Sequence, residues 1–301
     1  MTRIDQFESV FKSADKPVFR YEPFAVGSAL ALTDLDGDGA ESFSARVRKY
    51  LDASAQDGMP PLQVARGDES GKVLDTLQVV RGDEFGSIEE CLKIIDRDKP
   101  ELICTYRGLH SDCWRWGHSL GSYVEVLTQT VNIPVLVFPH PGSAAALSAD
   151  EDDCSRVMAM TDHLAGDSRL VNAALFFTPA SGTLHLSNIE DEQVFERYMA
   201  AIEKIPSVDS AAVRENLLLR ILKESQDYIQ SCRAVVAEQG LEVEVIEAVE
   251  LGMHVEDYRQ LVVAGEIDLL VMNTREVDQL AMHGLAYTLA VELSDIPLLL
   301  L

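Results

Sequence analysis

Apolar and polar residues follow two distinct patterns along this chain. Short unbroken apolar runs are typical of parallel strands buried on both faces. Runs that are mostly apolar and do not alternate occupy residues 29–33, 102–105, 133–138, 156–160, 267–272 and 298–301. Between two of the runs, apolar residues recur every three or four positions at Leu120, Tyr123, Val124, Leu127 and Val131. That spacing predicts a helix with one face on a sheet, so the chain as a whole predicts an α/β fold.

Weaker patterns supply the remaining elements. Further strands are predicted at residues 77–80, 183–186 and 243–246, and further helices at residues 4–12, 40–53, 88–95, 170–177, 194–205, 211–238 and 255–263. Ser87 and Glu90 predict a capping box at the start of the helix at 88–95. The helix at 211–238 is long and carries a wide apolar stripe, which favours packing on the core. Its outer end is an alternative surface for a protein partner.

A near repeat occupies part of the first half. The segment LQVARGDESG at Leu62 recurs as LQVVRGDEFG at Leu77, 15 residues later. A crossover helix and a second parallel strand seldom fit in that length, so we expect one helix of this half to be missing or reduced. The two Arg-Gly-Asp tripeptides are expected at strand ends and turns rather than in an integrin-binding loop.

Charge and cysteine content narrow the classes of partner. The 301 residues include 25 basic and 50 acidic side chains, a net charge of −25. Such a surface repels phosphate backbones and anionic lipids, which argues against nucleic acids and membrane surfaces as partners. No apolar run approaches the roughly 20 residues of a membrane span. The five cysteines show no paired spacing and suit reduced thiols, so we expect a cytoplasmic protein.

The pattern restarts halfway along the chain. Thr33 and Asp34 end the first strand, and Thr161 and Asp162 end the strand at 156–160. Such a recurrence indicates an internal duplication. We therefore predict a first domain at residues 1–141, a linker of small and acidic residues at 142–153, and a second domain at 154–301.

Small residues recur at a defined spacing after the strand at 102–105. Gly108, Ser111, Gly121 and Ser122 follow the pattern G-x2-S-x9-G-S, and the last two lead into a helix. Glycines permit close backbone approach, and free N–H groups at a helix start favour an anion. The stretch resembles the G-x2-G-x9-G-[ST] motif of the universal stress protein family, with Ser111 at the second glycine.

This resemblance implies a fold and a ligand. Each half is expected to form a doubly wound, mostly parallel five-stranded sheet with helices on both faces. In nucleotide-binding members of the family the motif holds the phosphates of ATP, which implies that it binds ATP or another adenine nucleotide here, together with Mg²⁺. The family also implies that Asp34, beside Thr33, lies near the adenine and ribose.

The family further implies how the two halves meet. Its members commonly dimerise by pairing their last strands. In this chain the strands at 135–138 and 298–301 are expected to pair with each other and give an internal pseudo-dimer. A further homodimer remains open.

The second half departs from the motif. Gly121 and Gly284 each lie 13 residues before a proline that precedes the last strand of their half. Glu276 stands where the first half has Gly108, and Leu285 stands where it has Ser122. A carboxylate there opposes a phosphate directly. We therefore expect a degenerate second site, formed by Thr161, Asp162, Glu276 and Gly284, without a phosphate cradle.

Two other patterns suggest different chemistry. Asp34, Asp36, Asp38 and Gly39 match the first half of a calcium loop, but Ala45 stands where a bidentate glutamate belongs, so we favour a solvated turn and assign no metal.

The residues around Cys113 also permit a catalytic interpretation. His110, Asp112, Cys113 and His118 could form a nucleophile pair or a zinc cluster, but their spacing matches no zinc pattern, and we assign no catalytic residue. Trp114 and Trp116 lie in the same loop, where packing is favoured over stacking on an adenine.

These patterns favour a stress-response or regulatory protein that binds an adenine nucleotide in its first half. The alternative is a nucleotide-free protein interaction module in which both pockets have decayed. An enzyme is not expected, although a slow ATPase remains open.

Overall fold

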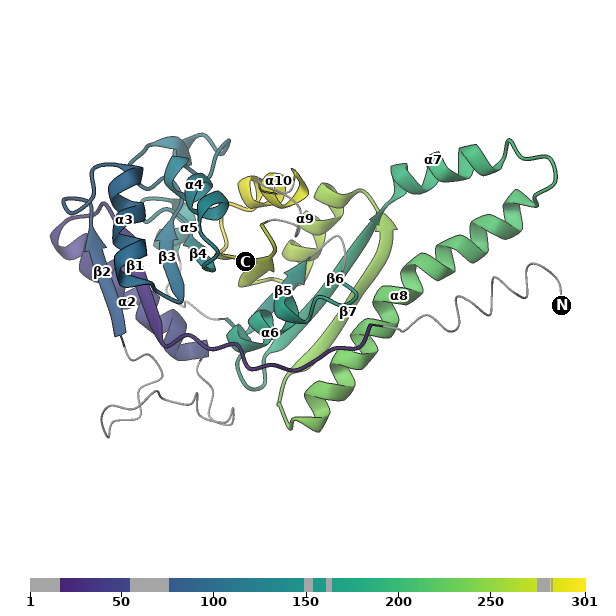
Figure 1. The fold of residues 1–301 in the computed structure, drawn as a ribbon, viewed down its shortest axis with the longest axis horizontal. Coiled ribbons are helices and arrows are strands. Elements are labelled where there is room, and N and C mark those ends of the chain that lie inside the picture. Colours follow the sequence, from purple (N-terminus) through teal and green to yellow (C-terminus); the bar gives the residue numbers. More distant parts are fainter. Residues whose placement is uncertain (1–16, 55–75, 149–153, 161–163, 275–281, 283) are drawn as a thin grey trace.

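The computed structural model describes residues 17–54, 76–148, 154–160, 164–274, 282 and 284–301. The described strands form one sheet in the order β2-β1-β3-β4-β9-β8-β5-β6-β7 (Figure 1). The α/β class and the parallel strands are confirmed. The two halves do not form separate sheets, because hydrogen bonds between β4 and β9 join them into a continuous nine-stranded one.

The first half contributes four described strands. Its elements are β1 (Ser28–Thr33), α2 (Gly37–Ser54), β2 (Thr76–Arg81), α3 (Ile88–Asp98), β3 (Leu102–Tyr106), a 3₁₀ turn (Cys113–Arg115), α4 (Ser122–Thr130), β4 (Val135–Phe138) and α5 (Ala144–Ser148). The second Arg-Gly-Asp tripeptide lies at the end of β2 and in the turn after it, as predicted. The predicted helix at 4–12 and the first copy of the near repeat lie outside the described residues.

The second half contributes five strands. Its elements are β5 (Arg156–Met160), α6 (Ser168–Phe177), β6 (Thr183–Asp191), α7 (Glu192–Ile202), α8 (Ser210–Glu238), β7 (Glu244–Gly252), α9 (His254–Ala264), β8 (Leu269–Met272), α10 (Gly284–Glu292) and β9 (Leu298–Leu300). The predicted strands at 183–186 and 243–246 are too short, since β6 and β7 stay paired in parallel along nine residues each.

The halves meet at the middle of the sheet. Val135, Leu136 and Val137 of β4 pair antiparallel with Leu300, Leu299 and Leu298 of β9, which confirms the predicted internal pairing. The other described pairings are parallel. The arrangement is therefore an internal pseudo-dimer.

Helices cover both faces of the sheet. In Figure 1, α2, α6 and α8 lie along one face, and α3, α4, α10 and α9 along the other. The strands between them are almost entirely buried, with burial of every residue in β3, β4, β8 and β9. This two-sided burial explains why their sequences are apolar without alternation.

An extended segment connects the two halves before β1. Residues 17–27, here called the strap, cross the second half before the chain enters the first (Figure 1). The Phe19 N–H donates to Ser231 Oγ of α8 at 2.9 Å, and the Phe19 ring packs edge-on against Tyr228. Asn172 of α6 donates to the Arg20 carbonyl and accepts from the Glu22 N–H. The strap thus fixes the start of the first half to helices of the second.

The start of α3 differs in one detail from the predicted capping box. Ser87 Oγ accepts the Glu90 N–H as expected, but the Glu90 carboxylate accepts the N–H of Gly86 rather than that of Ser87.

No helix in the described residues is long and apolar enough to cross a membrane. All five cysteines are free thiols.

Candidate functional site

The predicted site lies where the strand order of the first half reverses. The chain passes from β1 outward to β2 and then back to β3 on the other side of β1. In such sheets the crevice between the two diverging connections is the usual ligand site. Asp34 follows β1, and the loop that begins at Arg107 follows β3. The topology therefore brings the predicted aspartate and the predicted glycine loop to one edge.

Asp34 is bound on both carboxylate oxygens by its own chain. Tyr106 donates its hydroxyl to Oδ1, and the N–H of His110 donates to Oδ2 at 2.9 Å. The Tyr106 oxygen also accepts the Asp34 N–H at 2.9 Å and lies 3.0 Å from Thr33 Oγ1. Burial and the Asp34 carboxylate raise the pKa of Tyr106, which therefore stays a hydrogen-bond donor at neutral pH. Asp34 itself remains exposed to solvent.

Gly108 and Gly121 are in direct contact. Both have positive φ, +74° and +96°. A Cβ at Gly121 would lie 3.0 Å from both Cα and N of Gly108, and one at Gly108 would lie 2.9 Å from Trp114 Cδ1 and 3.0 Å from the Ser111 carbonyl oxygen. No larger residue fits either position without a shift, so the spacing found in the sequence builds a tightly closed loop.

The N–H groups of this loop are largely used inside it. Gly108 donates to the Leu120 carbonyl at 3.0 Å, and Ser111 donates to the Gly108 carbonyl at 2.8 Å. Gly121 donates to Ser119 Oγ at 3.0 Å. No side chain caps the start of α4, where Ser122 is the first residue and is exposed. Phosphate binding by the loop thus requires these internal bonds to be exchanged, except at the start of α4.

Aromatic rings surround the aspartate. The His110 ring lies 4.9 Å from both Phe85 and Tyr123. Trp114 stacks on His140 with centroids 4.1 Å apart and planes within 7°. Burial lowers the pKa of His140, so this stack is made by a neutral imidazole at neutral pH. Trp114 packs as predicted, whereas 66% of Trp116 is exposed and packing does not account for it.

Two side chains tie the loop to α10 of the second half. Arg107, 3% exposed, donates to the carbonyls of Ala290 and Leu293, the second at 2.8 Å. Burial lowers its pKa to about 10, so it remains charged at neutral pH. On α4, Glu125 accepts hydroxyl bonds from Ser119 at 2.7 Å and from Tyr287 of α10 at 3.0 Å. The candidate site and the junction of the two halves therefore share one loop.

Much of the predicted second site lies outside the described residues. Thr161, Asp162 and Glu276 fall there. Gly284 is the first residue of α10, and a Cβ placed on it would meet no atom of the described residues within 4 Å. Within the part of the chain that the structure describes, it makes no close backbone contact of the kind that Gly121 makes.

The alternative chemistries gain no support from the described residues. No group of three or more His, Cys, Asp or Glu side chains is placed there to hold a metal ion. Asp34 and Asp36 lie exposed in the connection between β1 and α2, as the predicted solvated turn requires, but α2 begins at Gly37, so Asp38 lies in its first turn.

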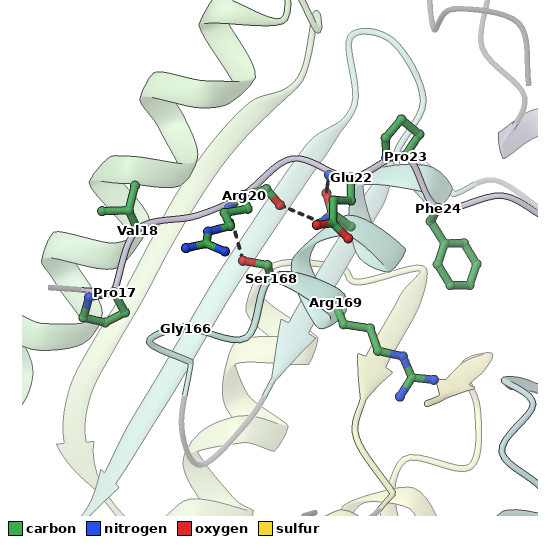
Figure 2. Close-up of a pocket in the computed structure, with 10 residues that line it drawn as sticks. Pro17, Val18, Arg20, Glu22, Pro23, Phe24, Gly166, Ser168 and Arg169 are labelled. Carbon is green, nitrogen blue, oxygen red and sulfur yellow. Dashed lines mark hydrogen bonds between the residues drawn. The ribbon is translucent and has the colours of Figure 1, made fainter. Parts of the chain in front are cut away.

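A separate groove of about 750 Å³ lies beside the strap. Its wall includes Pro17, Arg20, Ser168 and Arg169 (Figure 2). Arg20 and Arg169 point in different directions in this view, and the polar groups of Ser168 and Asn172 are bonded to the strap. The groove is distant from Asp34 in the fold and was not predicted.

Comparison with known proteins finds solved structures with a similar architecture. No protein-family model matches the chain, and no curated protein matches its sequence. A solved structure from Pseudomonas aeruginosa UCBPP-PA14, assigned to the universal stress proteins, is 14% identical, with 92% of this chain and 93% of that one covered at a TM-score of 0.50. This chain has the universal stress protein fold.

Other solved structures align over a similar length. A Pseudomonas aeruginosa PAO1 protein of unknown function is 13% identical, with 92% of each chain covered and a TM-score of 0.50. A universal stress protein from Archaeoglobus fulgidus is 14% identical over 92% of this chain and 98% of that one, with a TM-score of 0.46. At these identities residue roles are not transferred to this chain.

Three contributors to the site were not predicted in the roles that the structure gives them. His110 acts through its backbone N–H, Tyr106 through a hydroxyl at the end of an apolar strand, and Arg107 through carbonyls 183 or more residues away. A tyrosine and an arginine directly after Leu102–Thr105 could have marked the strand end as polar.

Proposed function

We propose that this chain is a stress-response or regulatory protein whose first half binds an adenine nucleotide. The observation that carries the proposal is the meeting of Asp34 with the Gly108–Gly121 contact at the point where the strand order reverses. In this proposal the second half is a structural partner, since Gly284 makes no such contact with the described residues.

A nucleotide that binds in this site would replace hydrogen bonds that the loop and Asp34 already make within the chain. Ribose hydroxyls would replace the His110 N–H on Asp34, which is exposed and reachable from solvent. Phosphates would take the N–H groups at the start of α4 and then those of Gly108 and Ser111. Mg²⁺ would accompany the phosphates, because the net charge of −25 opposes an uncompensated anion.

Calorimetric titration with ATP, AMP and a cyclic nucleotide, with and without Mg²⁺, tests the proposal. Mass spectrometry first establishes that no nucleotide co-purifies. We expect one site per chain. Asp34→Asn should weaken binding by roughly tenfold or more, the loss expected for a hydrogen bond to a charged group. The matched control is Asp36→Asn, an exposed aspartate two residues further along that should leave affinity unchanged.

The glycine contact is tested separately. Gly108→Glu should abolish binding, because the new side chain meets Trp114 and the Ser111 carbonyl. Gly117→Glu is the control, since Gly117 lies in the same loop, also at positive φ, and an added Cβ there meets nothing within 4 Å. Thermal melts of both variants separate misfolding from loss of the site. Unchanged binding in Gly108→Glu would refute the phosphate assignment.

A nucleotide-free interaction module is the second candidate. It is favoured by one observation, namely that Gly108, Ser111 and Gly121 already donate their N–H groups inside the loop. No heat of binding with any of the three nucleotides would select this candidate over the first.

A further inference from the structure

Helix α7 and the first half of α8 project from the sheet as a helical arm, defined here as residues 192–224 (Figure 1). No side chain of α8 between Ser210 and Glu224 is buried, whereas burial begins at Ser225. In α7, Phe195 and Met199 are buried. Arg214 of α8 reaches across to Glu196 of α7 with its two terminal nitrogens. The arm is thus held together by one internal face and presents its other faces to solvent.

The solvent-facing part of the arm is apolar to an unusual degree for this protein. Eight large hydrophobic side chains are exposed among the described residues, and half of them lie on the arm. These are Tyr198 at 57%, Ile205 at 47%, Val208 at 37% and Leu219 at 60% exposed. A second row on α8 is half-buried: Val213, Leu217, Leu218, Ile221 and Leu222. Apolar surface gathered on one projection marks an interaction site.

The charge of the arm differs from that of the whole chain. Residues 192–224 carry five basic and six acidic side chains, a net charge of −1, whereas the chain carries −25. The arm therefore does not select a strongly basic partner. It offers side chains of both signs around an apolar surface, and a surface of this kind can be complementary to itself.

We infer that the arm is a dimerisation surface for a second copy of this chain. In a twofold dimer each partner contributes the same patch. Two helical hairpins with exposed apolar side chains can then pack as a four-helix bundle. A standard interface takes about 20–30 residues from each partner, which residues 192–224 can supply.

Outside the arm each chain is strongly acidic, and this charge favours a dimer contact through the arm over a contact through another surface. The exposed half of α8, from Ser210 to Glu224, is about 22 Å long at 1.5 Å per residue. This exceeds the screening length of about 8 Å at physiological salt, so two arms can join while the acidic bodies stay apart. The sheet edge at β7 is a poorer contact, because Glu244, Glu247 and Glu250 on that strand would face their copies.

Sedimentation equilibrium of the full chain at physiological and high salt tests the inference. We expect a species of twice the chain mass of 33.2 kDa, retained or strengthened at high salt because the contact is apolar and the bodies repel. Leu219→Glu and Tyr198→Glu should each weaken the dimer at least tenfold. Both positions are exposed in the single chain, so both variants should fold, as circular dichroism would verify.

Val263→Glu is the matched control. Val263 is 74% exposed on α9, away from the arm, and its replacement should leave the dimer intact. A wild-type chain that sediments as a monomer at every concentration would overturn the inference, and residues 1–16 or another protein would then be the occupant of the arm. A dimer that survives both arm variants, or that Val263→Glu disrupts, would place the contact elsewhere and also overturn it.

Discussion

Gly121 and Gly284 occupy equivalent places in the two halves and have different surroundings. Gly121 directly precedes α4 and Gly284 is the first residue of α10, and each lies 13 residues before a proline. A Cβ on Gly121 would lie 3.0 Å from backbone atoms of Gly108, whereas a Cβ on Gly284 would meet none of the described residues within 4 Å. The helix that follows has 9 residues in both halves, whereas the sequence of the loop before it differs.

This difference separates two kinds of constraint. The helix-to-strand length is set by packing on the shared sheet, where α4 and α10 both lie beside the junction of β4 and β9. The glycine contact, among the described residues, closes a loop of the first half. The first half therefore keeps a candidate site, and the second provides the carbonyls and hydroxyl that hold it in place.

We expect the largest loss of stability when Arg107, which bonds the loop to the second half, is replaced. Arg107→Ala removes a buried guanidinium and leaves the Ala290 and Leu293 carbonyls without their donor. We expect a loss of about 3 kcal/mol in the free energy of unfolding, measured by urea denaturation. Arg115→Ala, an exposed arginine of the same loop paired with Asp112, should cost less than about 1 kcal/mol. Equal losses would mean that Arg107 does not join the halves.

Alanine substitutions at Gly121 and Gly284 test whether the two glycines differ in their contribution to stability. Gly121→Ala should destabilise by about 2 kcal/mol, because φ is +96° and the new methyl group contacts Gly108 backbone atoms. Gly284→Ala should stay within about 1 kcal/mol of the wild type, and in the stabilising direction, since alanine favours helix. Urea midpoints measure both. A Gly284→Ala variant as unstable as Gly121→Ala would show that the two loops are equivalent after all.

The smallest expected effect concerns acid stability. Burial lowers the pKa of His140 in the first half and of His185 in the second. The unfolded chain then takes up protons first as the pH falls through about 6.5, so stability is complete above that pH and declines below it. In His140→Gln the free energy of unfolding should fall less as the pH is lowered, by a few tenths of a kcal/mol, because the side chain is only half-buried and solvent screens its charge. Denaturation at pH 7.5 and 5.5 checks it, and an unchanged slope would contradict it.

The fold could be predicted from the sequence where packing dictates residue type. Runs such as Leu102–Thr105 are apolar because both faces of the strand are buried, so their pattern reports the structure directly. The prediction fell short in β6 and β7, where Ser187, Asn188 and Glu247 interrupt the apolar pattern. These residues stay in the strands because each ladder is held by backbone bonds that no side chain signals.

The candidate site was predictable in part for a similar reason. Gly108 and Gly121 were found because close backbone contact demands glycine. The contacts of Asp34 with Tyr106 and with the His110 N–H could not be found, since one depends on the end of a different strand and the other on backbone. That the halves share one sheet follows from the β4–β9 pairing, which the family resemblance suggested and no local pattern encodes.

The position of β9 in the sheet leaves two strand edges unpaired while the chain is being synthesised. Of the nine described strands it is translated last, yet it lies in the middle of the sheet, between β4 and β8. Until Leu298–Leu300 leave the ribosome, β4 and β8 each present an unpaired apolar edge, the kind of edge that recruits other chains. The nascent protein therefore has its greatest need of a chaperone late, when eight strands are already made and the central one is missing.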